Sequence, residues 1–109
     1  MPKNTDMEIE WQLPALMYAE QLSAKAQATL KQNLGILAHQ WERLEAPRKP
    51  GSLKAITTPN YPGPPTYSFR VGTDLRVILT LRDGKIVILD LVRNGQINKL
   101  RSILRRNQA

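Results

Sequence analysis

Cysteine is absent from this sequence, and histidine occurs once, as His39. Without cysteine the chain forms no disulfide, offers no thiolate nucleophile and cannot ligate zinc through sulfur. A single histidine cannot build a metal site alone, and His39 falls inside a predicted helix, where an ordinary helical position is the expectation. The composition therefore predicts no metal site, and nothing in it calls for a cofactor.

Long apolar runs are also missing. The first residues, MPKNTDMEIEW, contain no apolar segment typical of a secretion signal, and no stretch approaches the roughly 20 apolar residues of a membrane helix. We therefore expect a soluble, cytoplasmic protein with no membrane partner. A chain of 109 residues is predicted to form a single domain over residues 1–109 around its own core.

Acidic residues are scarce: 9 Asp and Glu stand against 16 Lys and Arg, which gives a net charge of +7 and a sequence pI near 10.2. Such an excess in a small domain indicates a polyanionic partner, with nucleic acid as the first candidate and an acidic protein segment as the second. A basic protein without such a partner is the remaining interpretation.

Hydrophobic spacing in the first half of the chain predicts a strand followed by two helices. The segment MEIEWQL alternates apolar and polar residues, as a half-buried strand does. Pro14 suits a first helical turn, Ser23 suits the cap of a second helix, and Pro47 ends the helical pattern. The predicted helical stripe, which should pack against a sheet, comprises Leu22, Ala26, Leu30, Leu34, Leu37, Trp41 and Leu44.

The second half predicts a loop and then strands. Ala46–Thr66 is rich in Pro and Gly and is predicted to be a long loop. Strands are expected at Tyr67–Val71, Leu75–Arg82 and Lys85–Arg93, with Asp83-Gly84 as a tight turn between the last two.

The final segment, GQINKLRSILRRNQA, predicts a short basic helix with Ile97, Leu100 and Leu104 on one face. The element order is then β-α-α-β-β-β-α. This order predicts an α+β fold in which a small, largely antiparallel sheet packs against a pair of N-terminal helices. The sheet would consist of the short N-terminal strand and a three-stranded meander.

Strand parity places arginines on the sheet face that points away from these helices. Because alternate residues share a face, Arg76 should face outward while Val77 enters the core. A loop at Gly72–Asp74 that pairs Phe69 with Val77 also sets Arg70 directly opposite Arg76. Two like charges in that position repel each other.

The tight turn at Asp83-Gly84 sets the next register. It pairs Arg76 with Leu91 and puts Arg93 opposite Asp74, on the face of Arg76. The same register places Asp90 on the apolar face near Val77, which is unfavourable. A β-bulge before Arg93 would relieve this and reverse the side that Arg93 faces.

In the regular register Arg70, Arg76 and Arg93 converge on one face, which Lys49 and Lys54 can reach from the loop. The apolar residues on this face are Ile78, Val87, Leu89 and Leu91. An apolar floor rimmed by guanidinium groups is typical of a surface that binds phosphates and bases. A solvated face whose charges are screened by salt is the alternative.

The stretch YSFRVGTDLRVILTL resembles the Y-x-x-R-x-G-x-x-R-V signature of the RelE/ParE toxin superfamily of bacterial toxin–antitoxin systems. GKIVILDLVRNG and PGSLKAI are similar to the next strand and to the loop before the sheet in that family, so the resemblance covers most of the chain. It implies metal-independent cleavage of mRNA in the ribosomal A site. In that reaction the 2′-hydroxyl attacks the adjacent phosphate, and cationic groups stabilise the phosphorane.

The resemblance also suggests roles for individual residues. Arg76 matches the family arginine at the scissile phosphate, Arg70 a basic residue of the preceding strand, and Arg93 the basic position that ends the last strand. These three are the predicted catalytic residues. The predicted RNA-binding residues are Lys49, Lys54, Lys99 and Arg101.

The sequence departs from the family at the positions that handle protons. No Tyr or His occurs near the C-terminus, and Ser68 stands where a catalytic lysine can occur. Because arginine rarely releases its proton, an all-arginine site is poorly suited to acid–base catalysis. Lys99 is a candidate substitute.

Three functions therefore remain open: a ribosome-dependent mRNA endonuclease, a ParE-like toxin that inhibits DNA gyrase through protein contacts, and a non-toxic basic RNA-binding module. Both toxin interpretations imply a cognate acidic antitoxin that wraps the basic domain in a hetero-oligomer. The first interpretation adds mRNA and the ribosome as partners.

Overall fold

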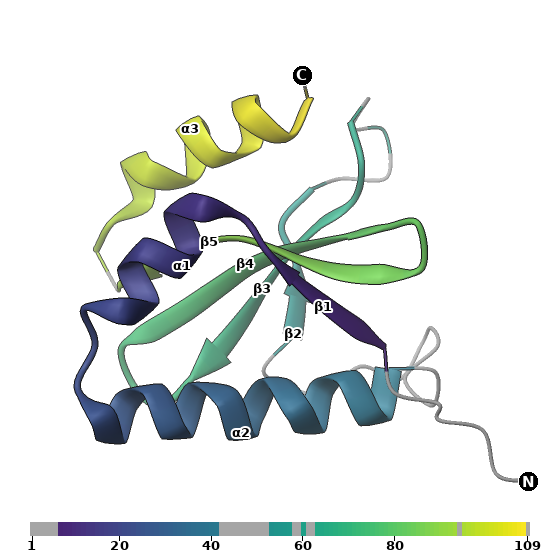
Figure 1. Cartoon of the computed structure of the whole chain (residues 1–109). Helices are drawn as coiled ribbons and strands as arrows, with labels where there is room; N and C mark the ends of the chain where they lie inside the picture. Colours follow the sequence, from purple (N-terminus) through teal and green to yellow (C-terminus); the bar gives the residue numbers. More distant parts are fainter. Residues whose placement is uncertain (1–6, 42–52, 58–59, 61–62, 94, 109) are drawn as a thin grey trace, which may run out of the picture.

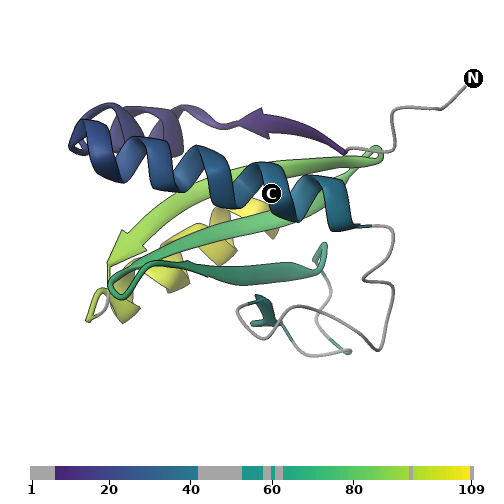
Figure 2. The ribbon, with the colours of Figure 1, turned by 90° about the horizontal axis from the view of Figure 1, so that it is seen from below.

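The computed structural model describes residues 7–41, 53–57, 60, 63–93 and 95–108. In chain order, its elements are β1 (Glu8–Trp11), α1 (Leu13–Glu20), α2 (Ala24–Gln40), β2 (Leu53–Ala55), β3 (Thr66–Val71), β4 (Leu75–Arg82), β5 (Lys85–Arg93) and α3 (Ile97–Gln108). The strands form one sheet in the order β1-β5-β4-β3-β2. Helices α1 and α2 lie on one side of this sheet and α3 lies on the other (Figures 1 and 2). The predicted α+β class is confirmed.

The sheet is largely antiparallel, as predicted, and its two edges add detail that the prediction lacked. β1 pairs with β5 in parallel, so the sheet is mixed. At the other edge, β2 lies inside the segment Ala46–Thr66 that was predicted to be a loop, and it pairs antiparallel with β3. A strand of three residues is too short to show a period of two, so the Pro and Gly content dominated the prediction.

The N-terminal helices begin where their capping residues predict. Pro14 lies in the first turn of α1, and the Ser23 hydroxyl at the N-cap of α2 accepts a hydrogen bond from the Ala26 N–H at 3.1 Å. The expected strand ends earlier than predicted, because Leu13 already belongs to α1 and its side chain is exposed. Leu44 and Pro47 lie outside the described residues.

The main core fills the space between α1, α2 and the sheet. The helical stripe supplies Leu30, Leu34 and Leu37, all buried as predicted. The sheet supplies alternate residues such as Phe69 and Val77. At the margin of this core Trp41 meets Tyr67 edge-on, with ring centroids 5.8 Å apart. Trp41 is therefore a packing residue, in agreement with the prediction.

A second, smaller core lies between α3 and the opposite face of the sheet. Its buried residues are Ile78, Val87, Leu89, Val92 and Ile103. Part of this set was predicted to form the exposed floor of a binding surface. That prediction is wrong, because the apolar stripe of α3 is buried against this face and covers it.

None of the helices in the described part of the chain is long and apolar enough to cross a membrane.

Two hairpins build the central part of the sheet, and both have the predicted turns. Asp83 and Gly84 adopt φ values of 53° and 73° between the paired residues Arg82 and Lys85, as a tight two-residue hairpin requires. In the other hairpin Val71 pairs with Leu75 and Arg70 with Arg76. The predicted arginine pair is thus confirmed.

A β-bulge in the last strand changes the register that the regular hairpin predicts. Leu79 pairs with Ile88 whereas Ile78 pairs with Asp90, so Leu89 is the extra residue. As a consequence, Asp90 does not lie near Val77 in the main core. It shares the face of Ile78 and is covered by α3.

The same bulge corrects two predicted pairs. Arg76 lies opposite Val92 and not Leu91, and Arg93 lies opposite Leu75 and not Asp74. Because one extra residue exchanges the two faces of a strand, the side chain of Arg93 shares the face of Leu75 rather than that of Arg76.

Candidate functional site

The side chains on the α3 face of the sheet form a row across three strands. Lys54 of β2 pairs with Ser68 of β3, and Arg70 of β3 pairs with Arg76 of β4. Because alternate residues share a face, all four side chains lie on the side of the sheet that carries α3. The pairing therefore brings a residue of β2 and residues of the two central strands β3 and β4 to one surface.

Beside the first turn of α3 this surface is hollowed, with a volume of about 300 Å³. The hollow is lined by Lys54, Ile56, Ser68, Arg76, Val92, Arg93, Gly95, Gln96 and Leu100. None of these lining residues is acidic, so we call this site the basic hollow. It combines three cationic strand residues, Lys54, Arg76 and Arg93, with apolar walls.

Ser68 contributes a buried hydroxyl to the wall of the basic hollow. Ser68 as a whole residue is 5% exposed, and its Oγ has no hydrogen-bond partner among the described residues. Lys54 beside it is exposed and Arg76 is half-buried. The site thus has charged groups at its mouth and a neutral polar atom inside it.

Arg93 lines the basic hollow, but its guanidinium group is bound elsewhere. Its Nη1 lies 2.9 Å from Asp74 Oδ2. The hydrogen bond to Asp74, reinforced by Tyr18 of α1, raises the pKa of Arg93 above its usual range. The structure therefore directs this arginine toward Asp74, and the predicted trio of Arg70, Arg76 and Arg93 is not assembled.

Lys99 of α3 is also engaged outside the basic hollow. Its Nζ donates a hydrogen bond to the Leu91 carbonyl at 3.0 Å, lies 3.5 Å from Asp90 Oδ1, and stands 4.6 Å from the centre of the Tyr18 ring. Of the other predicted RNA-binding residues, Arg101 is exposed, about 200° around the helix from Lys99. Lys49 lies outside the described residues.

Asp90 is a buried carboxylate that holds α3 on the sheet. The regular hairpin register predicted it on the opposite face, near Val77. Asp90 is 4% exposed and its Oδ2 lies 2.9 Å from Arg106 Nη2, while Oδ1 accepts the Leu91 N–H at 2.8 Å. The signal was present in the sequence: a lone aspartate inside the apolar run IVILDLV requires a cation, and the basic C-terminal helix follows it.

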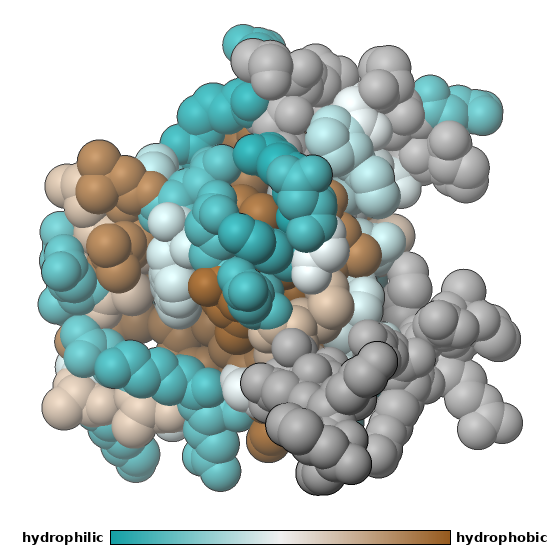
Figure 3. All heavy atoms as spheres, turned by 45° about the vertical axis from the view of Figure 1, so that its right-hand side comes forward, coloured by the Kyte–Doolittle hydropathy of each residue, from teal (hydrophilic) through white to brown (hydrophobic). Residues whose placement is uncertain are grey.

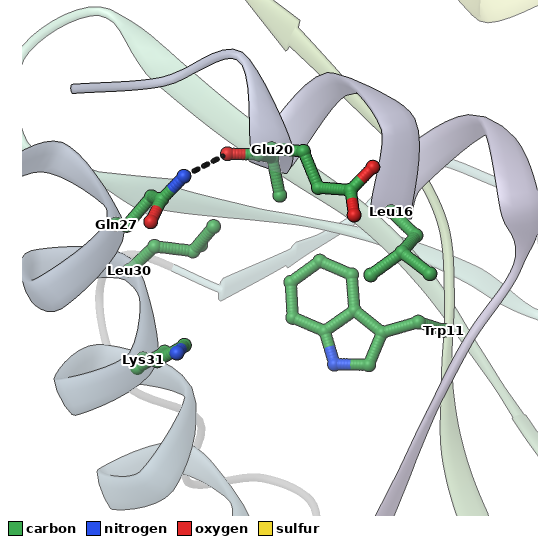
Figure 4. Close-up of a pocket in the computed structure, with 7 residues that line it drawn as sticks. Trp11, Leu16, Glu20, Gln27, Leu30 and Lys31 are labelled. Atoms are coloured by element: carbon green, nitrogen blue, oxygen red, sulfur yellow. Dashed lines mark hydrogen bonds between the residues drawn. The ribbon is translucent and has the colours of Figure 1, made fainter. Parts of the chain in front are cut away.

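A second hollow, of about 220 Å³, lies on the other side of the sheet between β1, α1 and α2. Figure 4 shows the Trp11 ring facing Leu16 and Leu30 there, and Gln27 bridging the two helices through a 2.8 Å hydrogen bond to the Ala19 carbonyl. Exposed apolar residues, among them Leu16 and Met17, continue along α1. Figure 3 shows a brown, hydrophobic patch at its upper left, on the side of these helices. This surface is apolar and suits a protein partner better than an anion.

Comparison with known proteins yields matches in structure alone. No protein-family model matches the chain, and no curated protein matches it in sequence. A chain of the archaeal RelE–RelB complex from Pyrococcus horikoshii OT3 superposes with a TM-score of 0.63 at 20% identity, over 84% of this chain and 98% of that one. A double mutant of the Escherichia coli toxin RelE in the free state gives 0.62 at 14% identity, over 93% and 97%.

A further solved structure, the YoeB dimer from Staphylococcus aureus, gives a TM-score of 0.55 at 21% identity, over 80% of this chain and 95% of that one. Each of these matches spans nearly the whole of the solved chain. The fold of this chain is therefore that of the RelE toxins.

Proposed function

We propose that this RelE-fold chain is the toxin of a type II toxin–antitoxin pair and that it cleaves mRNA on the ribosome without a metal ion. The observation that carries the proposal is the basic hollow, which Lys54 and Arg76 both line beside apolar walls, with no acidic residue among its described lining residues. Such a site attracts a phosphodiester group and leaves room for part of the attached nucleotide.

The proposed reaction is an internal phosphoryl transfer. The ribose 2′-oxygen attacks the adjacent phosphorus, the bond from phosphorus to the 5′-oxygen breaks, and the products are a 2′,3′-cyclic phosphate and a 5′-hydroxyl. The proton leaves the 2′-hydroxyl and another proton is added to the 5′-oxygen. Arg76 and Lys54 stabilise the negative charge that develops on the non-bridging oxygens.

The residues that line the basic hollow explain why the ribosome would be needed. None of these lining residues is His, Tyr, Asp or Glu, and arginine is a poor proton acceptor. Lys54 can act as a proton donor to the leaving 5′-oxygen. In this proposal the group that accepts the 2′-proton is supplied by the ribosome or by the bound RNA.

The same lack of a proton-accepting side chain among the described lining residues favours a second candidate function, ParE-like inhibition of DNA gyrase through protein contacts. In that case the cations of the basic hollow bind an acidic surface of a protein, and no bond of RNA is broken. The two candidates share the fold and differ in the molecule that is damaged in the cell.

An acidic protein antitoxin is the proposed partner in either case. The net charge of +7 and the exposed apolar residues of α1 suit an acidic, amphipathic segment. One solved structure of this fold is a RelE–RelB complex, and another is the toxin–antitoxin complex RelBE2 from Mycobacterium tuberculosis. A small neighbouring gene should encode a partner that co-purifies; if none exists, the toxin proposal loses its support.

The two candidates are separated by inducing the chain in cells and mapping the 5′ ends of mRNA while plasmid supercoiling is followed. We expect new 5′ ends inside translated regions, and we expect Arg76→Ala to abolish them while its circular dichroism spectrum stays that of the parent. Intact transcripts with altered supercoiling would replace the nuclease proposal with the gyrase one. Unimpaired growth with neither change would contradict both.

A further inference from the structure

The Ser68 hydroxyl is a buried polar group in the basic hollow for which the described residues provide no hydrogen bond. Ser68 sits on β3 between its partners Lys54 and Ile78, is 5% exposed, and its Oγ has no hydrogen-bond partner among the described residues. Buried hydroxyl groups are nearly always hydrogen-bonded, because an unsatisfied one loses the bonds that water would give it. The position therefore suggests a bond that forms only when something enters the hollow.

The side chains around Ser68 indicate what kind of molecule could form the missing hydrogen bond with its hydroxyl group. Lys54 lies directly across on β2, and Arg76 lies diagonally across on β4, two residues from Ile78, which Ser68 faces. Both side chains line the same hollow, and none of the lining residues that the structure describes is acidic. Ammonium and guanidinium groups only donate hydrogen bonds, so an occupant that suits all three side chains must accept them.

The apolar walls and the volume of the hollow restrict the class of possible ligands further. Ile56, Val92 and Leu100 form apolar walls, which limit water and strengthen charge interactions inside. A volume of about 300 Å³ lies at the lower end of the range for ligand pockets, so it admits a small oxyanion with part of a nucleotide. A tetrahedral anion has enough acceptor oxygens for donors that come from three different strands.

We propose that the basic hollow binds a phosphate group and that the Ser68 hydroxyl donates a hydrogen bond to one of its oxygens, while Lys54 and Arg76 neutralise its charge. Ser68 thus becomes a binding residue that fixes the orientation of the phosphate. The assignment of this phosphate to an mRNA backbone rests on the proposed function; the binding of phosphate itself does not.

The inference predicts that Ser68→Ala does not lower the melting temperature without phosphate but reduces the rise in melting temperature that phosphate produces. In the absence of phosphate the variant removes an unsatisfied buried group, so its melting temperature should equal or exceed that of the parent. With phosphate, a ligand that binds only the folded state raises the melting temperature of the parent, and the variant should show much less of this rise.

The experiment compares the full chain, Ser68→Ala and Ser102→Ala by thermal unfolding in rising inorganic phosphate, with ionic strength held constant by chloride. Ser102 is an exposed serine of α3 and serves as the matched control. We expect Ser68→Ala to weaken phosphate binding about tenfold, the loss expected for one hydrogen bond to a charged group. Amide NMR shifts in the parent should cluster at Lys54, Ser68, Arg76 and Gln96.

Equal phosphate affinity in the parent and Ser68→Ala, or shifts scattered over the basic surface, would overturn the inference. A second arm uses a 2′-deoxy dinucleotide, which has one internal phosphodiester and cannot be cleaved by a 2′-hydroxyl. Tighter Ser68-dependent binding of the dinucleotide identifies a backbone phosphate, whereas tighter binding of inorganic phosphate identifies a terminal or free one. Binding of neither probe overturns the inference.

Failure of the inference is distinguishable from failure of the proposed function. Ser68-dependent phosphate binding in a chain that leaves cellular mRNA intact would keep the inference and remove the nuclease proposal. Cleavage of mRNA by a chain whose Ser68→Ala variant binds phosphate like the parent would do the reverse.

Discussion

At the scale of single residues, strand parity predicted the site better than it predicted the register of the last strand. The pairing of Arg70 with Arg76 followed from the loop Gly72–Asp74 and is confirmed. The placement of Arg93 was wrong because one extra residue, Leu89, reverses the faces beyond it. A regular alternation cannot reveal such a bulge, although the charged Asp90 inside an apolar strand pointed to it.

Two glycines give a prediction at this scale with a built-in control. Gly84 adopts φ +73° in the hairpin turn, where an L side chain is strained, so Gly84→Ala should destabilise the fold by about 1–2 kcal/mol. Gly35 lies in α2, with no atom within 4 Å of an added Cβ, so Gly35→Ala should stabilise it by about 0.5–1 kcal/mol. Urea denaturation measures both free energies of unfolding, and a shift in the same direction for both would contradict the role assigned to backbone conformation.

At the scale of elements, the sequence predicted the helices and central strands but not where α3 docks. Amphipathic spacing shows that a helix has an apolar face, yet it does not say which surface covers that face. Here the second face of the sheet is apolar enough to form a second core with Ile103, and Asp90 anchors the basic side of the helix through Arg106. Helix α3 consequently covers most of the sheet face that was expected to be open, and the basic hollow is the accessible part that we describe beside it.

The anchoring of α3 is tested by Asp90→Asn. The neutral side chain leaves Arg106 and Lys99 without their charged partner, so we expect a loss of about 1–3 kcal/mol in the free energy of unfolding. Asp90→Asn should also accelerate amide hydrogen exchange in α3 more than in β4.

The control for this variant is Asp83→Asn. Asp83 is exposed at a φ of 53°, which asparagine tolerates equally well, so its stability should stay within about 0.5 kcal/mol of the parent. If Asp90→Asn were as stable as Asp83→Asn, with exchange in α3 unaltered, the ion pairs would not be what holds this helix.

At the scale of the whole molecule, the fold class and element order were predictable because each element has a clear local period. The basic hollow was not predictable in the same way. Its walls come from β2, β3, β4, β5 and α3, and its depth depends on how these distant segments pack. Sequence alone predicted that Lys54 can reach the sheet face of Arg76 from the loop, but it did not predict the strand β2 that carries Lys54 or the place of Ser68 beside it.

The central claim is that Arg76 in the basic hollow stabilises the charge of a cleaved RNA phosphate. The most direct test is the cleavage rate of an mRNA on programmed ribosomes by the purified chain, compared with Arg76→Ala and with the exposed Arg105→Ala on α3. We predict that Arg76→Ala is slower by about 100-fold or more, the typical loss when a transition-state donor is removed, while Arg105→Ala cleaves like the parent. A folded Arg76→Ala variant that cleaves at the parental rate would contradict this claim.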